Sequence, residues 1–409
     1  MEPNVKSIWV GLSLTPASHS LSHLLKAFSS PDEIFDADDE TIADALGSHQ
    51  RDIRRLCRKD LSEAEKIVAF CAGRRISIVT WFDDDYPESL RKIDKPPAIL
   101  FLTGDRTLLS STKTVGIVGT RTPSDYAARM TFDIAVDLAS CGAVVVSGMA
   151  YGVDGAAAAG ALAAGGKTIA VLGCGLDVTY PAKHAKLRRE IEQNGLVVSE
   201  YPPGSPPERY HFPERNRIIS GLSTGVFVAE GTLQSGAMIT AEYAEKQGKH
   251  LFALPGRLDS PLAEGPIKLM KEGARPVSCA DDILSKLESE TPGTYDLSIL
   301  LSDRRVPDFD ASVKRYDVSL SPVRGGYSHR AACPTETASP APANRAEPDL
   351  SSLSDGEKAV YLQLETPRTA DELSREGTDP SEILASLTTL EIRGLIRSLP
   401  GGRYERADR

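Results

Sequence analysis

Apolar runs alternate with amphipathic stretches through the middle of the chain. The runs typical of buried strands are TVGIVG, AVVVSG, KTIAVLG, LVVSEY, TGVFVAEG and HLFALPG, between residues 114 and 256. Helix-period segments such as YAARMTFDIAVDLASCG and GAMITAEYAEKQGK separate most of them. This alternation predicts a parallel sheet covered by helices on both faces. We therefore expect an α/β domain over residues 111–290.

The flanks of this domain have different patterns. Residues 1–75 carry apolar side chains at helical spacing between acidic and Ser-rich breaks, which predicts a small helical, SAM-like domain. Residues 76–110 combine short β-rich runs with Pro-rich turns and are interpreted as a connecting segment. Residues 291–352 hold few large apolar side chains and much Pro, Ala and Ser, so we expect a flexible linker.

The pattern of residues 353–409 predicts a winged-helix domain. Three helical patterns begin at capping residues, namely Ser354, Thr369 and either Asp379 or Ser381. The ending GLIRSLPGGRYER is typical of a two-strand wing with a Pro-Gly-Gly turn.

The charge distribution narrows the class of protein. A formal net charge of −10 over 409 residues argues against a protein that coats nucleic acid indiscriminately. Residues 111–287 are neutral, however, with 18 Lys and Arg against 18 Asp and Glu. Basic residues cluster there at 183–189 (KHAKLRR) and 209–217 (RYHFPERNR), which is compatible with a focused basic patch.

Cysteines and apolar runs indicate the cellular compartment. The six cysteines are scattered without CxxC spacing, which indicates reduced thiols, not a disulfide frame or a zinc site. No apolar run approaches the ~20 residues of a membrane span, and MEPNVKSIWVGL has no cleavable signal pattern. The seven histidines lack metal-ligand spacing. We expect a cytoplasmic protein with no metal, cofactor or membrane contact.

Glycine-rich loops follow four of the predicted strands: GTRTPS (119–124), SGMAYGVD (147–154), GCGLDVTYP (173–181) and EGTLQSGAMIT (230–240). Ligands of open parallel sheets bind outside the carboxyl ends of the strands, where helix N-termini offer backbone amides. Four such loops predict a phosphate- or nucleotide-binding edge. Arg121 would be the cation of the first loop.

The stretch HFPERNRIISGLS places an Arg-Asn-Arg triplet directly before a short apolar helix. Exposed guanidinium groups of Arg215 and Arg217, beside Asn216 and free helix N–H groups, suit a phosphate. A solvated, capped helix start is the alternative. Tyr210 and Phe212 can stack on unpaired bases or pack beneath the loop.

Catalytic patterns are sparse. GCGLDV lacks the third glycine of the dinucleotide fingerprint, and ALAAGGKT runs from helix into strand, the reverse of a P-loop, so no ATPase is inferred. Asp154, Asp177 and Glu230 lie at predicted strand ends, where a carboxylate serves acid–base chemistry or holds a loop through backbone N–H groups. The structural role is the favoured interpretation.

These loops, in this order, resemble the DNA processing protein A family (DprA, also called Smf). The resemblance covers roughly residues 80–285 and is carried by GTRTPSDY, SGMAYGVDGAAAAGAL, VLGCGLDVTYPAKH, SEYPPG, HFPERNRIISGLS, EGTLQSGAMITAEYA, FALPG and GPIKLMKEGA. It implies an extended Rossmann-like domain that binds single-stranded DNA, forms a homodimer and loads RecA recombinase during natural transformation.

The resemblance also implies DNA-binding positions by motif. They are Arg121, Ser147, Gly148, Lys183, Arg209, Phe212, Arg215, Asn216 and Arg217. Three positions depart from the usual pattern of the family. Thr120 stands where serine is usual, His184 where asparagine is common, and Gly231 where alanine is usual. The last two bear on the detailed shape of the pocket.

We expect an ATP-independent, non-enzymatic binder of single strands with little sequence preference, because charged contacts dominate and no base-reading pattern is visible. Two alternatives stay open. A nucleotide-cleaving, phosphoribohydrolase-like enzyme would use Glu230 of the EGT turn in N-glycosidic cleavage. A transcription regulator would read duplex DNA with its winged helix and sense a nucleotide in the central domain.

Overall fold

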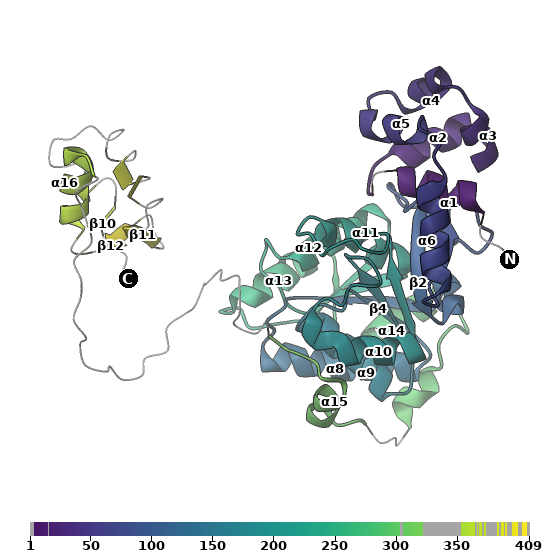
Figure 1. Cartoon of the computed structure of the whole chain (residues 1–409). Helices are drawn as coiled ribbons and strands as arrows, with labels where there is room; N and C mark the ends of the chain where they lie inside the picture. Colours follow the sequence, from purple (N-terminus) through teal and green to yellow (C-terminus); the bar gives the residue numbers. More distant parts are fainter. Residues whose placement is uncertain are drawn as a thin grey trace. The chain divides into compact units, whose positions relative to one another are not determined.

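The structure is a computed structural model. It describes residues 4–14, 16–302 and 306–321, together with 353–364, 366, 368–369, 372–373, 383, 386–387, 389–390, 395–399 and 403–406. The chain divides into two compact units, residues 1–327 and 328–409, which are described separately (Figure 1). None of the helices in the described part of the chain combines the length and apolar character that a bilayer crossing needs.

The larger unit is built on one sheet, whose described strands follow the order β1-β2-β6-β5-β4-β3-β7-β8-β9. They are β1 (Ser77–Thr80), β2 (Ile99–Gly104), β3 (Thr114–Val118), β4 (Val144–Ser147), β5 (Thr168–Leu172), β6 (Leu196–Ser199), β7 (Gly225–Val228), β8 (His250–Ala253) and β9 (Arg275–Pro276). From β6 to β9 every neighbouring pair is parallel. The six predicted strands are β3 to β8, and the predicted parallel sheet is confirmed.

The first two strands extend this sheet with the opposite polarity. β1 pairs antiparallel with β2, and β2 pairs antiparallel with β6. The Tyr86 hydroxyl donates to the Pro97 carbonyl at 2.7 Å and fastens the connection between β1 and β2. Residues 76–110 are therefore part of the sheet, and their interpretation as a connecting segment was wrong.

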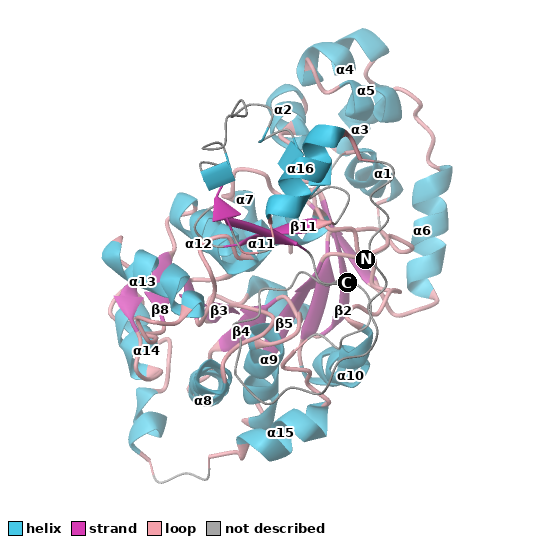
Figure 2. Ribbon diagram, turned by 90° about the vertical axis from the view of Figure 1, so that its left-hand side faces the viewer, coloured by secondary structure: helices cyan, strands magenta, loops and turns pink. Residues whose placement is uncertain are grey.

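Helices cover both faces of the sheet (Figure 2). They are α7 (Glu88–Arg91), α8 (Asp125–Ser140), α9 (Val153–Ala163), α10 (Ala185–Asn194), α11 (His211–Leu222), α12 (Gly236–Lys246), α13 (Glu264–Lys271) and α14 (Asp281–Glu288), with 3-10 turns η1 (Arg106–Ser110), η2 (Ala182–His184) and η3 (Pro261–Ala263). Side chains of a strand alternate between faces. Val146 accordingly packs in one cluster with Ile218 of α11, and Val145 in another with Ala135 of α8.

The N-terminal residues form helices, as expected. They are α1 (Val5–Ser13), α2 (Ser20–Ala27), α3 (Pro31–Asp36), α4 (Asp39–Leu46), α5 (Gln50–Leu56) and α6 (Ser62–Ala72). The core of these helices is continuous with the sheet. Gly11 of α1 lies so close to Ile99 of β2 that an added Cβ would come within 2.7 Å of the Ile99 Cβ. The helical region is therefore packed directly on the edge of the sheet.

The first part of the expected linker is folded. Residues 297–301 form the 3-10 turn η4 (Leu297–Leu301), and α15 (Phe309–Tyr316) packs against α8, α9 and α10. The Phe309 ring meets the Phe132 ring edge-on at 5.3 Å, and Tyr316 is buried. The linker prediction was wrong for residues 291–302 and 306–321, because a few large side chains are enough to dock a short helix on an existing surface. Residues 322–352 lie outside the described residues.

The second unit has its own small core. It contains α16 (Asp355–Gln363), β10 (Arg368–Thr369), β11 (Ile396–Leu399) and β12 (Arg403–Arg406), and the strands are antiparallel in the order β10-β12-β11. Ser354 and Glu357 form a capping box at α16. Thr369 accepts a hydrogen bond from the Glu372 N–H at 3.3 Å. The predicted caps at Ser354 and Thr369 and the paired wing strands are thus confirmed. Asp379, Ser381 and the turn at 400–402 lie outside the described residues.

Candidate nucleic-acid interface

The carboxyl ends of the parallel strands meet where β3 lies between β4 and β7. The chain continues from β3 to one side of the sheet and later returns through β7 to the other. Open parallel sheets bind ligands at such a switch point. The Thr120 N–H donates to the Glu230 carbonyl at 2.8 Å, and the Val153 N–H donates to the Thr120 carbonyl at 3.2 Å. The loops after β3, β4 and β7 are therefore joined at this edge.

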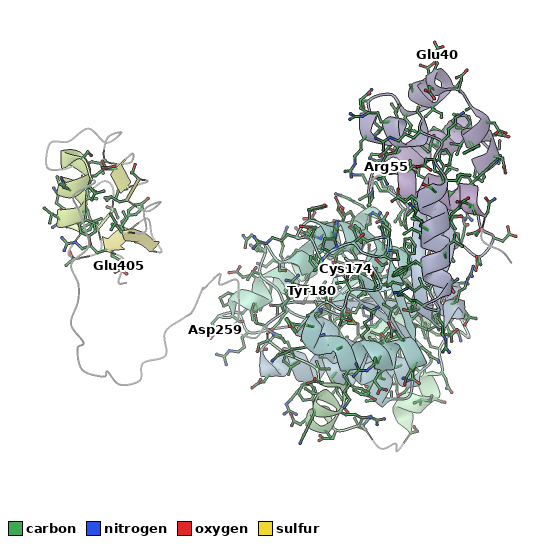
Figure 3. All side chains as sticks on the ribbon, in the orientation of Figure 1. Glu40, Arg55, Cys174, Tyr180, Asp259 and Glu405 are labelled. Atoms are coloured by element: carbon green, nitrogen blue, oxygen red, sulfur yellow. The ribbon has the colours of Figure 1, made fainter. Side chains whose placement is uncertain are left out.

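A row of exposed cations and half-buried rings follows the same edge. The guanidinium carbon of the exposed Arg121 lies 5.4 Å from the centre of the Phe212 ring. The Phe212 ring is 5.3 Å from the ring of Tyr180, which lies in the loop after β5 and is labelled in Figure 3. One turn of chain later, η2 carries the exposed Lys183. We call Arg121, Tyr180, Lys183 and Phe212 the cationic edge. Arg121 and Lys183, chosen from the sequence, thus come to one side of the sheet.

Two further residues lie beside the row, immediately before α11. Arg209 is exposed, and Tyr210 is 62% exposed. The Tyr210 ring meets the His211 ring edge-on at 4.5 Å. His211 in turn places its Nδ1 3.0 Å from the Gly173 carbonyl oxygen. These contacts fix the turn before α11 to the loop after β5.

The Arg-Asn-Arg triplet is buried, and the expectation of an exposed triplet in front of a helix was wrong. Helix α11 already begins at His211, so the triplet lies in its second turn. Arg215 is 4% exposed, and its Nη1 donates to the Gly148 carbonyl at 2.9 Å and to the Val171 carbonyl. Burial lowers the pKa of Arg215, and the Asp154 carboxylate opposes this effect. Arg215 ties the ends of β4 and β5 together from beneath.

Asn216 and Arg217 also point into the protein. The Asn216 amide donates to the Gly236 carbonyl of α12 at 3.1 Å. Arg217 is 1% exposed, and its Nη2 lies 2.5 and 2.6 Å from the two carboxylate oxygens of Glu200. Successive helical side chains point about 100° apart, so a helix covered on several sides buries all three. The sequence signal for this ion pair was Glu200, the acidic residue of SEYPPG, for which no partner was predicted.

Ser147 and Gly148 serve the same internal network. The Ser147 hydroxyl donates to the Ile117 carbonyl at 2.8 Å. Ser147 and Gly148 are both buried. A Cβ added at Gly148 would overlap the guanidinium of Arg215. Gly148 therefore makes room for a side chain of its own protein, and the expectation of a glycine kept free for a ligand was wrong at this position.

Two of the three strand-end carboxylates hold loops. Glu230 accepts hydrogen bonds from the backbone N–H of Ser124 at 2.8 Å and from its hydroxyl at 2.7 Å. Ser124 is the N-cap of α8. Asp177 accepts a hydrogen bond from the Gly204 N–H at 2.7 Å. This geometry agrees with the structural role favoured from the sequence.

Asp154 lies beneath the cationic edge. It is buried and accepts a hydrogen bond from the Ala150 N–H at 3.3 Å. Burial raises the pKa of Asp154, while the positive charges of Arg215 and Arg121 oppose this effect. The carboxylate therefore lies within electrostatic reach of one buried and one exposed arginine. It balances part of the positive charge that the edge concentrates.

Sequence reasoning missed two contributors to this site. Tyr180 was not selected, although an aromatic residue directly after a glycine-rich strand end was a signal for a ring at the edge. His184 was noted as a departure from the usual pattern of the family, and it is fully buried. Within the residues that the structure describes, no group of three or more His, Cys, Asp and Glu side chains could hold a metal ion.

Comparison with known proteins decides the family. A family model described as DNA recombination-mediator protein A matches residues 77–288. The chain belongs to this family, the DNA processing protein A family. A second model, described as the DprA winged helix domain, matches residues 341–402 and confirms the predicted winged helix.

Relatives in the DNA processing protein A family match much of the chain. DNA processing protein DprA of Bacillus subtilis is 41% identical over 54% of this chain and 75% of its own length. Protein Smf of Synechocystis is 36% identical over 79% of this chain and 78% of its own. The X-ray structure of DprA from Streptococcus pneumoniae is 34% identical, matches 70% of this chain and 99% of that one, and superposes with a TM-score of 0.62. These matches confirm the fold class as a mostly parallel α/β sheet with a winged helix.

Proposed function

We propose that the cationic edge binds single-stranded DNA without a requirement for ATP and with little sequence preference. The observation that carries the proposal is the row that runs from the exposed Arg121 over the half-buried rings of Phe212 and Tyr180, with the exposed Lys183 three residues after Tyr180. Cations attract phosphates irrespective of sequence. Rings beside them offer stacking faces to bases.

Accessible rings favour a single strand over a duplex. Bases of a duplex are stacked on one another and present only their edges, whereas unpaired bases can stack on protein side chains. The exposed Tyr210 extends the set of available rings. Arg209, exposed beside it, adds charge along the same path. Arg215, Asn216 and Arg217 support this surface from beneath and are not part of the proposed contact.

The role of DNA in the relatives supports the proposal. Their names describe DNA processing and DNA recombination mediation. For this chain we accordingly extend the proposal to a cytoplasmic homodimer that hands single strands to RecA recombinase, as in natural transformation. The binder needs no catalytic group, because charge and stacking suffice.

The two alternatives are less well supported. An enzyme that cleaves nucleotides would need the Glu230 carboxylate free for its substrate, but both oxygens accept hydrogen bonds from Ser124. A duplex-reading regulator would depend on the winged helix, so it predicts a preference for duplex DNA that disappears when residues 353–409 are deleted.

Fluorescence anisotropy with labelled oligo-dT and with a duplex, over a salt series, tests the proposal. We expect tighter binding of oligo-dT, and a steep loss of affinity as salt rises. The double variant Arg121→Ala, Lys183→Ala should lose about tenfold or more in affinity, and its salt slope should fall by about 0.7 for each phosphate contact removed.

A matched pair of cations provides the control. Lys113 and Lys167 are exposed and precede β3 and β5, so they lie at the opposite, amino end of the strands. Lys113→Ala with Lys167→Ala removes the same net charge and should leave the affinity within about twofold. Equal losses in the two double variants would mean that net charge, and not this edge, attracts DNA. Wild-type affinity in the Arg121, Lys183 variant would refute the assigned surface.

A further inference from the structure

The chain after α15 returns to the loops of the cationic edge. The Ser319 carbonyl accepts a hydrogen bond from the Gly152 N–H at 3.0 Å, directly before α9. The Ser319 N–H donates to His184 Nε2 at 3.0 Å. Gly152 ends the loop after β4, and His184 follows Lys183 in η2. A single residue thus joins the two loops from outside the sheet. We call residues 317–321 the clasp.

The surface beneath the clasp is shaped to receive it. A Cβ added at Gly155 of α9 would lie 2.8 Å from a Val318 methyl group and 2.9 Å from His184 Cε1. Val318 is itself buried. Upstream, α15 is anchored by the Phe309 ring, which packs on Phe132. The clasp therefore docks through apolar contacts and through both polar backbone groups of Ser319.

His184 occupies the centre of this arrangement. Because Nε2 accepts from Ser319, the ring is neutral and its Nδ1–H donates to the Met149 carbonyl at 3.1 Å. Met149 has a left-handed φ of 57°, which is unfavourable for a side chain of its size. The Tyr151 ring packs edge-on against the imidazole at 5.2 Å. His184 thus stabilises an otherwise unfavourable loop directly beside the cationic edge.

Protonation of the ring would release the clasp. A proton on Nε2 converts the acceptor into a donor that faces the Ser319 N–H, so this hydrogen bond is lost. The charged groups near the ring are Asp154 of α9 and Asp317 of the clasp, and both favour the protonated form. Burial outweighs them and lowers the pKa of His184 below its usual 6.5. The hydrogen bond from the Ser319 N–H to His184 is therefore intact at neutral pH and is lost as pH falls through the lowered pKa of His184.

We propose that the clasp holds the loops after β4 and β5 in the geometry that binds DNA, and that His184 is the positioning residue that makes this hold sensitive to pH. The proposal rests on the proposed function of the cationic edge. The clasp lies outside the ranges matched by the two family models, 77–288 and 341–402.

Two variants of Ser319 test whether the backbone hydrogen bonds of the clasp contribute to DNA binding. Ser319→Pro removes the N–H that bonds to His184, whereas Ser319→Ala keeps both backbone bonds and loses only the hydroxyl contact to the Ser321 carbonyl. We expect Ser319→Pro to bind oligo-dT about three- to tenfold more weakly at pH 8, with Ser319→Ala unchanged. Hydrogen exchange at the Gly152 amide should be faster only in the proline variant.

His184→Asn tests the pH sensitivity. The asparagine NH2 group can take the place of Nδ1–H at Met149, but its oxygen then lies at the position of Cδ2 and leaves no acceptor at the position of Nε2, which faces the Ser319 N–H. Wild-type affinity should fall when the pH is lowered from 8 to a value well below the usual 6.5 of histidine, because the pKa of His184 is lowered by burial. The asparagine variant should bind weakly at both pH values, with no such fall.

The outcomes distinguish the clasp from the proposed function. Faster exchange at Gly152 in Ser319→Pro, together with wild-type affinity, would overturn the positioning role while leaving the DNA-binding edge intact. Unchanged exchange at Gly152 would overturn the clasp itself. Wild-type protein that fails to bind oligo-dT would overturn the proposed function and, with it, the role of the clasp in DNA binding.

Discussion

Replacement of Arg217 by methionine tests whether the Arg-Asn-Arg triplet supports the fold or contacts DNA. The guanidinium is 1% exposed and lies against both oxygens of Glu200, which is 5% exposed. Methionine has a similar length and fills the space without charge. Arg217→Met therefore leaves the Glu200 carboxylate buried without its cation.

The expected loss follows from the burial of this pair. Removal of one partner of a buried ion pair costs about 3–5 kcal/mol, because the remaining charge is uncompensated. Replacement of both partners by apolar side chains of similar size is often close to neutral. The double variant Glu200→Met, Arg217→Met should therefore recover most of the stability that the single variant loses.

The loss should also depend on pH. Burial raises the pKa of Glu200 above its usual 4.5, and Arg217 is the main group that opposes this effect. Without Arg217 the folded-state pKa rises further. A carboxyl group with a raised folded-state pKa destabilises the fold as pH rises through that pKa, so Arg217→Met should be closer to wild type at pH 4 than at pH 7.

Urea denaturation of the three proteins at both pH values measures these differences. Oligo-dT binding over a salt series then distinguishes a role of Arg217 in stability from a direct contact between Arg217 and a DNA phosphate. If Arg217 only supports the fold, the folded fraction of Arg217→Met binds with the wild-type salt slope. Wild-type stability combined with a salt slope reduced by about 0.7 would show that Arg217 touches a phosphate, and the structural interpretation would be wrong.

Two further substitutions test the loops beneath the cationic edge. Gly148→Ala places a methyl group where the guanidinium of Arg215 lies, so we expect a loss of about 1–3 kcal/mol in stability, measured by urea denaturation. Gly236→Ala, at a glycine that has open space and no positive φ, is the reference. Glu230→Gln leaves one of the two Ser124 donors without a proper acceptor and should cost about 1–2 kcal/mol without any change in the salt slope of oligo-dT binding. Release of free base from a nucleoside monophosphate by the wild type, lost in Glu230→Gln, would instead favour the enzyme.

The sequence was sufficient for the parallel strands, because each is a nearly continuous apolar run between glycine-rich ends. It was not sufficient for β1 and β2. Their apolar content was visible, but pairing with β6 is a long-range contact that no local pattern specifies. The folded segment at 306–321 was missed for a related reason. Composition averaged over the expected linker concealed Phe309 and Tyr316, which are enough to dock one helix on α8 and α9.

The sequence placed the candidate residues at one edge of the sheet, but several of them lie beneath the surface in the structure. Charged side chains are seldom fully buried unless they are paired, so the exposed interpretation of the triplet was the natural one. Arg217 is buried because it pairs with the Glu200 carboxylate. For Arg215 the partners are the Gly148 and Val171 carbonyls. Every residue has a backbone carbonyl, so the sequence does not indicate which carbonyls accept hydrogen bonds from Arg215.

The resulting edge has two layers of positive charge with different tasks. Arg215 is buried and positions the strand ends, whereas Arg121 is exposed and rests on the Phe212 ring. Asp154 lies within electrostatic reach of both. A phosphate that approaches Arg121 therefore meets a guanidinium held by a ring on loops that the buried layer fixes in place. Loss of the exposed layer should change the salt dependence of binding, while loss of the buried layer should change the stability of the loops that present it.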